Sequence, residues 1–149
     1  MFFWRQKGLF MIDEYGKILK FNRRTARDTA FKYLFIKHIT NADMEEITEP
    51  LSGLEFRDED KAYILAAVSG VVENLAEIDE KIESNSKGWK KSRISSVCLS
   101  ALRLAIYEIL YMPDIPTSVS INEAVEIIKT YDDPKIASFA NGILGKLEK

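Results

Sequence analysis

The strongest constraint on the fold is a stripe of apolar residues that recurs at helical spacing in the middle of the chain. Its members are separated by four, three, four, three and four residues: Ile64, Val68, Val71, Leu75, Ile78 and Ile82. This spacing places them on one face of an amphipathic helix, or of two helices with a break near Leu75. Such a face has to be buried against other elements, so the stripe predicts a helical protein with an internal core.

Helical patterns continue on both sides of the stripe. Asn22 is suited to cap a helix that runs to about Ile39, and a short acidic helix is expected over residues 43–49. Residues 94–111 are apolar almost all round, with Arg103 and Glu108 as the only charges. That composition is typical of a helix at the centre of a bundle.

Two more helices are expected near the C-terminus. Ser120 and Glu123 have the spacing of a capping box, which predicts a helix from there to about Tyr131. Asp133-Pro134 predicts the start of the last helix. Gly142 within it costs about 1 kcal/mol relative to alanine, which close helix packing or access of a ligand to the backbone would explain. The fold class is therefore all-α, a compact bundle of about seven helices.

The first 21 residues do not follow the helical pattern. Residues 9–12 and 17–21 are apolar-rich runs on either side of residues 13–16, and they are consistent with a small hairpin or with a loosely ordered arm. The expected organisation is an N-terminal arm over residues 1–21 and one helical domain over residues 22–149.

Composition excludes several classes of protein. The longest uncharged run, residues 62–72, is far shorter than the roughly 18 residues of a membrane span. Cys98 is the only cysteine and His38 the only histidine, so neither a disulfide nor a zinc site is expected. No nucleophile motif, phosphate loop or dinucleotide fingerprint is present. We expect a cytoplasmic protein that is not an enzyme and uses no cofactor or metal.

Charge is unevenly distributed in a chain whose net charge is only −2. Residues 1–37 hold nine Lys and Arg against three Asp and Glu, whereas residues 38–85 hold three basic and thirteen acidic side chains. Such asymmetry favours a separate face for a polyanion.

The basic region centres on Arg23, Arg24 and Arg27, with Lys20 beside them. Arg23 and Arg27 are four residues apart and share a helix face. They lie in the first turns, where free N–H groups and the positive end of the helix dipole favour phosphate. This pattern indicates a nucleic-acid contact, or alternatively a solvated basic helix start.

Two other regions allow a similar interpretation. Basic residues surround Trp89, an arrangement that can hold single-stranded nucleic acid but more often anchors a loop: Lys87, Lys90, Lys91 and Arg93. Lys135 and Phe139 lie near the start of the last helix, where Phe139 has the spacing of a core residue.

Several segments resemble, in order, the NusB family of bacterial transcription antitermination factors. The resemblance covers about residues 22–147 and is carried by RRTARD at 23–28, GVVEN at 70–74, LRLAIYEIL at 102–110, DIP at 114–116, INEAVE at 121–126 and FANGIL at 139–144.

The resemblance implies a helical protein that binds boxA RNA of ribosomal-RNA leader transcripts. It further implies that the protein acts with NusE, a small-subunit ribosomal protein, in an antitermination complex with RNA polymerase. By that resemblance Arg23, Arg24 and Arg27 contact boxA phosphates, with Lys135 and Phe139 as further contacts.

The chain departs from the family pattern at Phe35, Cys98 and Leu99, in the region that the family uses toward NusE. These departures leave open an alternative function, a helical protein-interaction module with the same fold, with a homodimer as one form of it. DNA binding through a helix-turn-helix is a less favoured hypothesis, because no second helix has the basic and amide residues needed to read a major groove.

Overall fold

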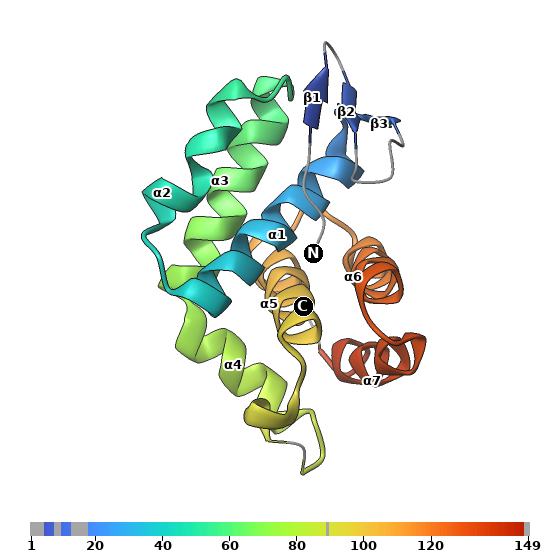
Figure 1. Cartoon of the computed structure of the whole chain (residues 1–149). Helices are drawn as coiled ribbons and strands as arrows, with labels where there is room; N and C mark the ends of the chain where they lie inside the picture. The colour runs from blue at the N-terminus through green and yellow to red at the C-terminus, as the bar shows by residue number, and fades with distance from the viewer. Residues whose placement is uncertain (1–4, 8–9, 13–17, 89, 148–149) are drawn as a thin grey trace.

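The structure, a computed structural model, describes residues 5–7, 10–12, 18–88 and 90–147. In this part of the chain seven α-helices form a bundle (Figure 1), which confirms the predicted fold class. They are α1 (Arg23–Thr40), α2 (Met44–Thr48), α3 (Asp58–Glu73), α4 (Leu75–Ser84), α5 (Ser96–Tyr111), α6 (Thr117–Tyr131) and α7 (Pro134–Leu144). Two short 3-10 helices, η1 (Glu49–Gly53) and η2 (Lys91–Arg93), lie in the connections.

Helix α5 is the central helix, as its apolar sequence predicts. It packs against α1, α3, α4, α6 and α7. Leu102 and Ile106 in its middle are completely buried. Its two charged residues each bind a different neighbouring helix, since Arg103 pairs with Asp79 of α4 and Glu108 with Arg27 of α1. Burial of these charges is therefore compensated.

The apolar stripe occupies two helices, which confirms the alternative with a break near Leu75. Helix α3 ends at Glu73, and the side-chain amide of its C-cap Asn74 donates a hydrogen bond of 2.8 Å to the carbonyl oxygen of Gly70. The stripe residues other than Leu75 are at most 1% exposed. Both helices therefore present the predicted face to the core.

Two of the three predicted helix caps are confirmed. Asn22 and Thr25 form a reciprocal capping box at the start of α1, and the Asp133 side chain accepts from the backbone N–H of Lys135 at the start of α7. The capping box predicted at Ser120 is wrong, because α6 begins three residues earlier at Thr117. The Ser120 hydroxyl instead donates a hydrogen bond of 2.8 Å to buried Glu108.

Helix packing does not explain the glycine in α7. A Cβ added at Gly142 would meet no atom within 4 Å, and the residue is exposed. Gly70 in α3 is the opposite case, because a Cβ there would lie 2.2 Å from the ring of Tyr107 on α5.

Three short strands precede the bundle: β1 (Arg5–Lys7), β2 (Phe10–Ile12) and β3 (Ile18–Lys20). They form one antiparallel sheet in the order β1-β2-β3, beside the start of α1 (Figure 1). The pairing of β2 with β3 agrees with the hairpin alternative, and β1 is an addition that the sequence analysis did not anticipate. No helix in the described ranges is long and apolar enough to cross a membrane.

Candidate nucleic-acid interface

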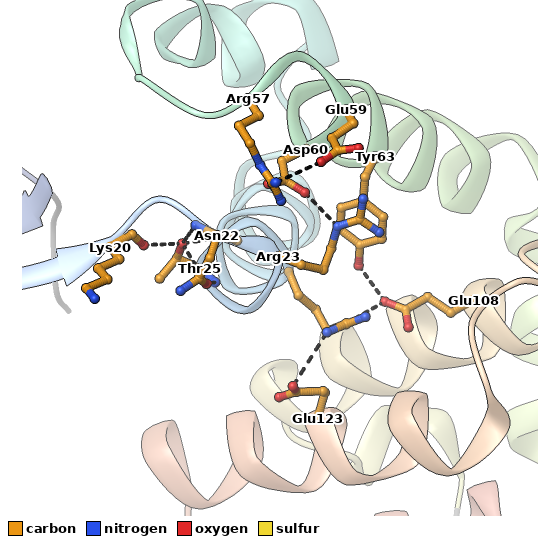
Figure 2. Close-up of polar contacts among 11 residues, drawn as sticks. Lys20, Asn22, Arg23, Thr25, Arg57, Glu59, Asp60, Tyr63, Glu108 and Glu123 are labelled. Carbon is orange, nitrogen blue, oxygen red and sulfur yellow. Dashed lines mark hydrogen bonds and ion pairs between the residues drawn. The ribbon is translucent and has the colours of Figure 1, made fainter. Parts of the chain in front are cut away.

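The first turn of α1 fixes the backbone that carries the arginines, and Figure 2 shows its capping contacts with Arg23 beside them. The backbone N–H of Thr25 donates to the Asn22 side chain at 3.0 Å, and the N–H of Asn22 donates to the Thr25 hydroxyl at 2.9 Å. The same hydroxyl donates to the carbonyl oxygen of Lys20 at 2.6 Å. The end of β3 is thereby attached to the helix start.

Arg23 lies at the edge of the surface and is held from the side of α3. Its Nε donates to Oδ1 of Asp60 at 2.8 Å, and its guanidinium lies 4.5 Å from the ring centroid of Tyr63 (Figure 2). Asp60 is completely buried, whereas the Arg23 side chain is 40% exposed. Arg23 is therefore both anchored and accessible to solvent.

Arg24 is the most exposed of the three arginines. Its side chain is 75% exposed, and its Nε lies 3.2 Å from Oε1 of Glu123 on α6. A guanidinium carries five N–H donors, so an ion pair through Nε leaves donors for another anion. Lys20, just before the helix, is exposed as well.

Arg27 points into the bundle, and its side chain is only 6% exposed. Its Nε donates to Oε2 of Glu108 at 2.7 Å, and its Nη1 lies 3.6 Å from Glu123. Burial alone would lower the pKa of Arg27, but the hydrogen bond to Glu108 and the surrounding acidic groups outweigh it and raise this pKa. The burial of Arg27 argues against the direct phosphate contact expected from the sequence.

Glu108 is the centre of this buried network. Besides Arg27, it accepts a hydrogen bond from the hydroxyl of Tyr63 (Figure 2). It accepts another from the hydroxyl of Ser120. Burial, and then the nearby Glu108 carboxylate, raise the pKa of Tyr63 well above its ordinary value. The network ties α1, α3, α5 and α6 together directly beneath Arg23 and Arg24.

Lys135 and Phe139 lie on α7, which is connected to α1 through the end of α6. The Tyr131 hydroxyl donates to Oδ1 of Asp28 at 2.8 Å, and its ring stacks on Phe31 with centroids 5.5 Å apart. Lys135 is exposed and Phe139 is half-buried. These contacts of Tyr131 join the end of α6, three residues before α7 begins, to α1.

The sequence also matches a known protein family and known proteins over most of its length. The model of the NusB family matches residues 24–149. The chain belongs to this family. Curated relatives named Transcription antitermination protein NusB include one from Acetivibrio thermocellus, 48% identical over 85% of this chain and 88% of the relative. Another, from Clostridium botulinum, is 40% identical over 85% of this chain and 99% of the relative.

Solved NusB structures share the fold. T. maritima NusB superposes with a TM-score of 0.77 and 37% identity, covering 84% of this chain and 89% of that protein. A crystal structure of antitermination factors NusB and NusE in complex with dsRNA gives a TM-score of 0.72 at 27% identity, covering 83% of this chain and 92% of the other. The strands β1 to β3 precede the first residue matched by the NusB family model.

The residues predicted for the NusE-facing region are mostly internal. Cys98 is completely buried and Leu99 is 3% exposed, so their side chains do not reach a partner directly. Both lie in the first turns of α5, where the apolar sequence directs them into the core. Phe35 on α1 is half-buried, and Ile39 four residues later is 57% exposed. Burial raises the pKa of the Cys98 thiol to about 12.

One of the basic side chains in the loop before α5 forms an ion pair within the fold. Lys91 donates to Oδ2 of Asp79 at 3.0 Å, and Arg103 binds both oxygens of the same carboxylate at 2.9 Å. Lys87, Lys90 and Arg93 are exposed. Trp89, on which the stacking interpretation depends, lies outside the described residues.

The acidic partners of the arginines were not predicted as site residues. Asp60, Glu108 and Glu123 belong to three different helices, and their convergence on α1 depends on how those helices pack. One signal was available in the sequence, because an acid such as Glu108 in an otherwise apolar central helix requires a buried cation or hydrogen-bond donors.

Proposed function

We propose that the chain is a transcription antitermination factor that binds boxA-type single-stranded RNA of ribosomal-RNA leader transcripts together with NusE. In this role it promotes read-through by RNA polymerase. The names of the curated relatives and the fold shared with NusB bound to NusE and RNA support this proposal. The observation that carries it is the presentation of Arg24 at the solvent-exposed start of α1.

Arg24 is suited to phosphate because it is exposed, always charged and oriented. Its contact with Glu123 at 3.2 Å holds the side chain over the surface while donors remain for a ligand. The N-terminus of α1 adds the positive end of a helix dipole. Arg23 and Lys20 flank Arg24, so an RNA backbone can contact several cations in sequence.

In this proposal Arg27 is a positioning residue. It holds α1 against Glu108 and so fixes the first turns that carry Arg23 and Arg24. Lys135 and Phe139 are proposed as further contacts, Lys135 for phosphate and the ring of Phe139 for a base. Tyr131 holds the end of α6 against α1, and α7 packs against α6 and α5.

We further propose that the protein acts by binding rather than by chemistry, in the cytoplasm and without a cofactor. RNA affinity then depends strongly on salt, because each neutralised phosphate releases counterions. The slope of log K against log salt is about −0.7 per contact for a single strand.

A competition assay tests this function. Labelled boxA RNA is bound to the full chain and displaced with unlabelled boxA RNA, with RNA of the same composition in scrambled order, or with duplex DNA. We expect boxA RNA to compete best, and the Arg23→Ala, Arg24→Ala double variant to bind weakly. Equal competition by duplex DNA, or wild-type affinity in the double variant, would contradict the proposal.

For NusE, we propose a contact surface at the end of α1 that includes Phe35 and Ile39. Residues four apart share a helix face, and the exposed apolar side chain of Ile39 makes this face suited to a protein. Sedimentation of the chain with NusE and RNA tests this surface, with Ile39→Asp expected to weaken the NusE complex. A stable homodimer that binds neither NusE nor RNA would favour the alternative function, a helical protein-interaction module.

A further inference from the structure

Two tyrosines near the C-terminal end of α5 form a stacked pair at the surface of the bundle. Their ring centroids lie 5.0 Å apart, and Tyr111 is 38% exposed while Tyr107 is half-buried. The Tyr107 ring occupies the space on α3 that a side chain at Gly70 would fill. Tyr111 is therefore the outer member of the pair, with part of its surface open to solvent.

A carboxylate from another helix holds the outer ring in place. The Tyr111 hydroxyl donates a hydrogen bond of 2.6 Å to Oε1 of Glu77, which lies in the first turn of α4 and is exposed. An ionised carboxylate can accept about four hydrogen bonds, so this bond leaves Glu77 able to accept others. The fold thus places an oriented aromatic ring beside a carboxylate that faces solvent.

The acidic side chains of this surface carry negative charge that the described residues do not neutralise. Glu73 is exposed and lies one turn beyond Gly70 on α3, on the side of the helix that borders the tyrosines. Among the described residues, neither Glu73 nor Glu77 forms an ion pair, although Lys81 follows Glu77 by one helical turn. Both acids lie in the segment 38–85, which holds three basic and thirteen acidic residues.

This combination of groups favours a cationic side chain as the ligand. A guanidinium is attracted to the face of an aromatic ring and also forms charge-assisted hydrogen bonds with a carboxylate, whereas a phosphate would be repelled by the two acids. The protein contains the same arrangement internally. The Arg23 guanidinium lies 4.5 Å from the ring centroid of Tyr63 while its Nε donates to Asp60 at 2.8 Å.

We propose that this surface is a docking site for an arginine-rich segment of a partner protein. One arginine of the partner lies against the Tyr111 ring and donates to Glu77, and a neighbouring arginine pairs with Glu73. Tyr107 is a positioning residue, because its stacking supports the outer ring. The inference concerns protein binding and does not depend on the proposed RNA-binding function.

The site is separate from the arginine surface of α1. Asp60, which binds Arg23, and Glu73 lie near opposite ends of α3, about 20 Å apart along the helix axis at 1.5 Å per residue. A basic protein segment can therefore bind at Glu73 while Arg23 and Arg24 remain accessible to RNA.

The test follows the tyrosine rings of the full chain by NMR, with carbon-13 in the tyrosine rings. The probe is a synthetic peptide in which arginine alternates with alanine, and its matched control has citrulline, which is uncharged, in place of arginine. We expect the arginine peptide to shift the signals of Tyr107 and Tyr111 and the citrulline peptide to leave them unchanged. Tyr111→Ala and Glu77→Gln, followed at the Tyr107 signal, should each raise the Kd of the arginine peptide about threefold.

Two surface variants on α6 are the matched controls. Val119 is 37% exposed, close to the value for Tyr111, and Glu126 is an exposed acid. Val119→Ala and Glu126→Gln should bind the peptide as the wild type does. Thermal unfolding and boxA RNA affinity should be unchanged in Glu77→Gln, so that a weaker peptide affinity reports on the docking site alone.

The inference is overturned if the arginine peptide leaves both tyrosine signals unchanged, or if the citrulline peptide shifts them equally. It is also overturned if Tyr111→Ala and Glu77→Gln bind the peptide as tightly as the two control variants. RNA is the alternative occupant, and single-stranded polyuridine added without peptide tests it. A shift of the Tyr111 signal by polyuridine would show that the surface binds nucleic acid and that the assignment to a basic protein is wrong.

Discussion

Nε of Arg27 lies 2.7 Å from Oε2 of Glu108 and joins the first helix to the central helix within the core. Both side chains are nearly inaccessible to solvent, at 6% and 1% exposure. A basic residue that the sequence assigns to an RNA surface therefore has a structural role beneath that surface.

Glu108→Gln should lower the free energy of unfolding by about 3 kcal/mol, because it leaves the Arg27 guanidinium buried without its main counter-charge. Urea denaturation followed by circular dichroism measures the change. The matched control is Glu126→Gln, an exposed residue whose ion pair with Lys129 spans 3.9 Å. A loss no greater than that of the control would contradict a stabilising role for the network.

Arg24→Ala and Arg27→Ala should have different effects. Arg24 is exposed, so its loss should leave stability unchanged, weaken RNA binding and reduce the salt slope by about 0.7. Arg27 is buried, so its loss should destabilise the fold and leave the salt slope of the remaining folded protein unchanged. Titrations at several salt concentrations, with thermal unfolding of each variant, distinguish the two. If Arg27→Ala reduces the salt slope without any loss of stability, then Arg27 contacts an RNA phosphate directly.

Gly70→Ala should destabilise the bundle, because its Cβ would overlap the ring of Tyr107 and displace that ring from its packing against α3. Overpacking of this kind costs about 1–3 kcal/mol. Gly142→Ala is the control, since no atom lies within 4 Å of its added Cβ. It should stabilise α7 by up to about 1 kcal/mol. Thermal unfolding of both variants checks the prediction, which is wrong if the two shift in the same direction.

Stability should fall as the pH drops below about 6.5, and His38 should be responsible. Partial desolvation of the ring and the adjacent Arg103, whose Nη1 lies 3.3 Å from Nδ1, lower the pKa of His38 below its ordinary value of 6.5, with Lys91 acting in the same direction and Asp79 against it. The unfolded chain then binds the proton more readily than the folded chain, so stability is complete above the unfolded pKa and decreases below it.

His38 is the only histidine, so unfolding measured between about pH 5 and pH 8 reports mainly on this residue. His38→Gln cannot titrate but can still accept from Arg103, and its stability should be nearly constant over the same range. A wild-type profile as flat as that of the variant would exclude the effect.

Cys98 should resist alkylation in the folded protein. Burial, with a further contribution from Asp132, raises the pKa of its thiol to about 12, and only the thiolate reacts. Iodoacetamide followed by mass spectrometry should label Cys98 slowly under native conditions and rapidly in urea. Fast native labelling would show that the start of α5 opens readily.

The helices could be predicted from the sequence because each depends on local patterns. The stripe from Ile64 to Ile82, the cap at Asn22 and the apolar run of α5 depend on spacing along one segment, and all three are confirmed. The cap at Ser120 was wrong because its hydroxyl binds Glu108 on another helix, a contact that no local pattern contains.

The candidate site was predicted less completely than the fold. Sequence placed Arg23, Arg24 and Arg27 in the first turns of one helix, and similarity to NusB gave them a common role. Helix spacing cannot tell which arginine faces solvent, because that depends on where α3, α5 and α6 place their carboxylates. The tertiary structure decided that Arg24 is exposed beside Glu123 and Arg27 is buried on Glu108. The physical reason is that a charge is buried only where a distant segment supplies its counter-charge.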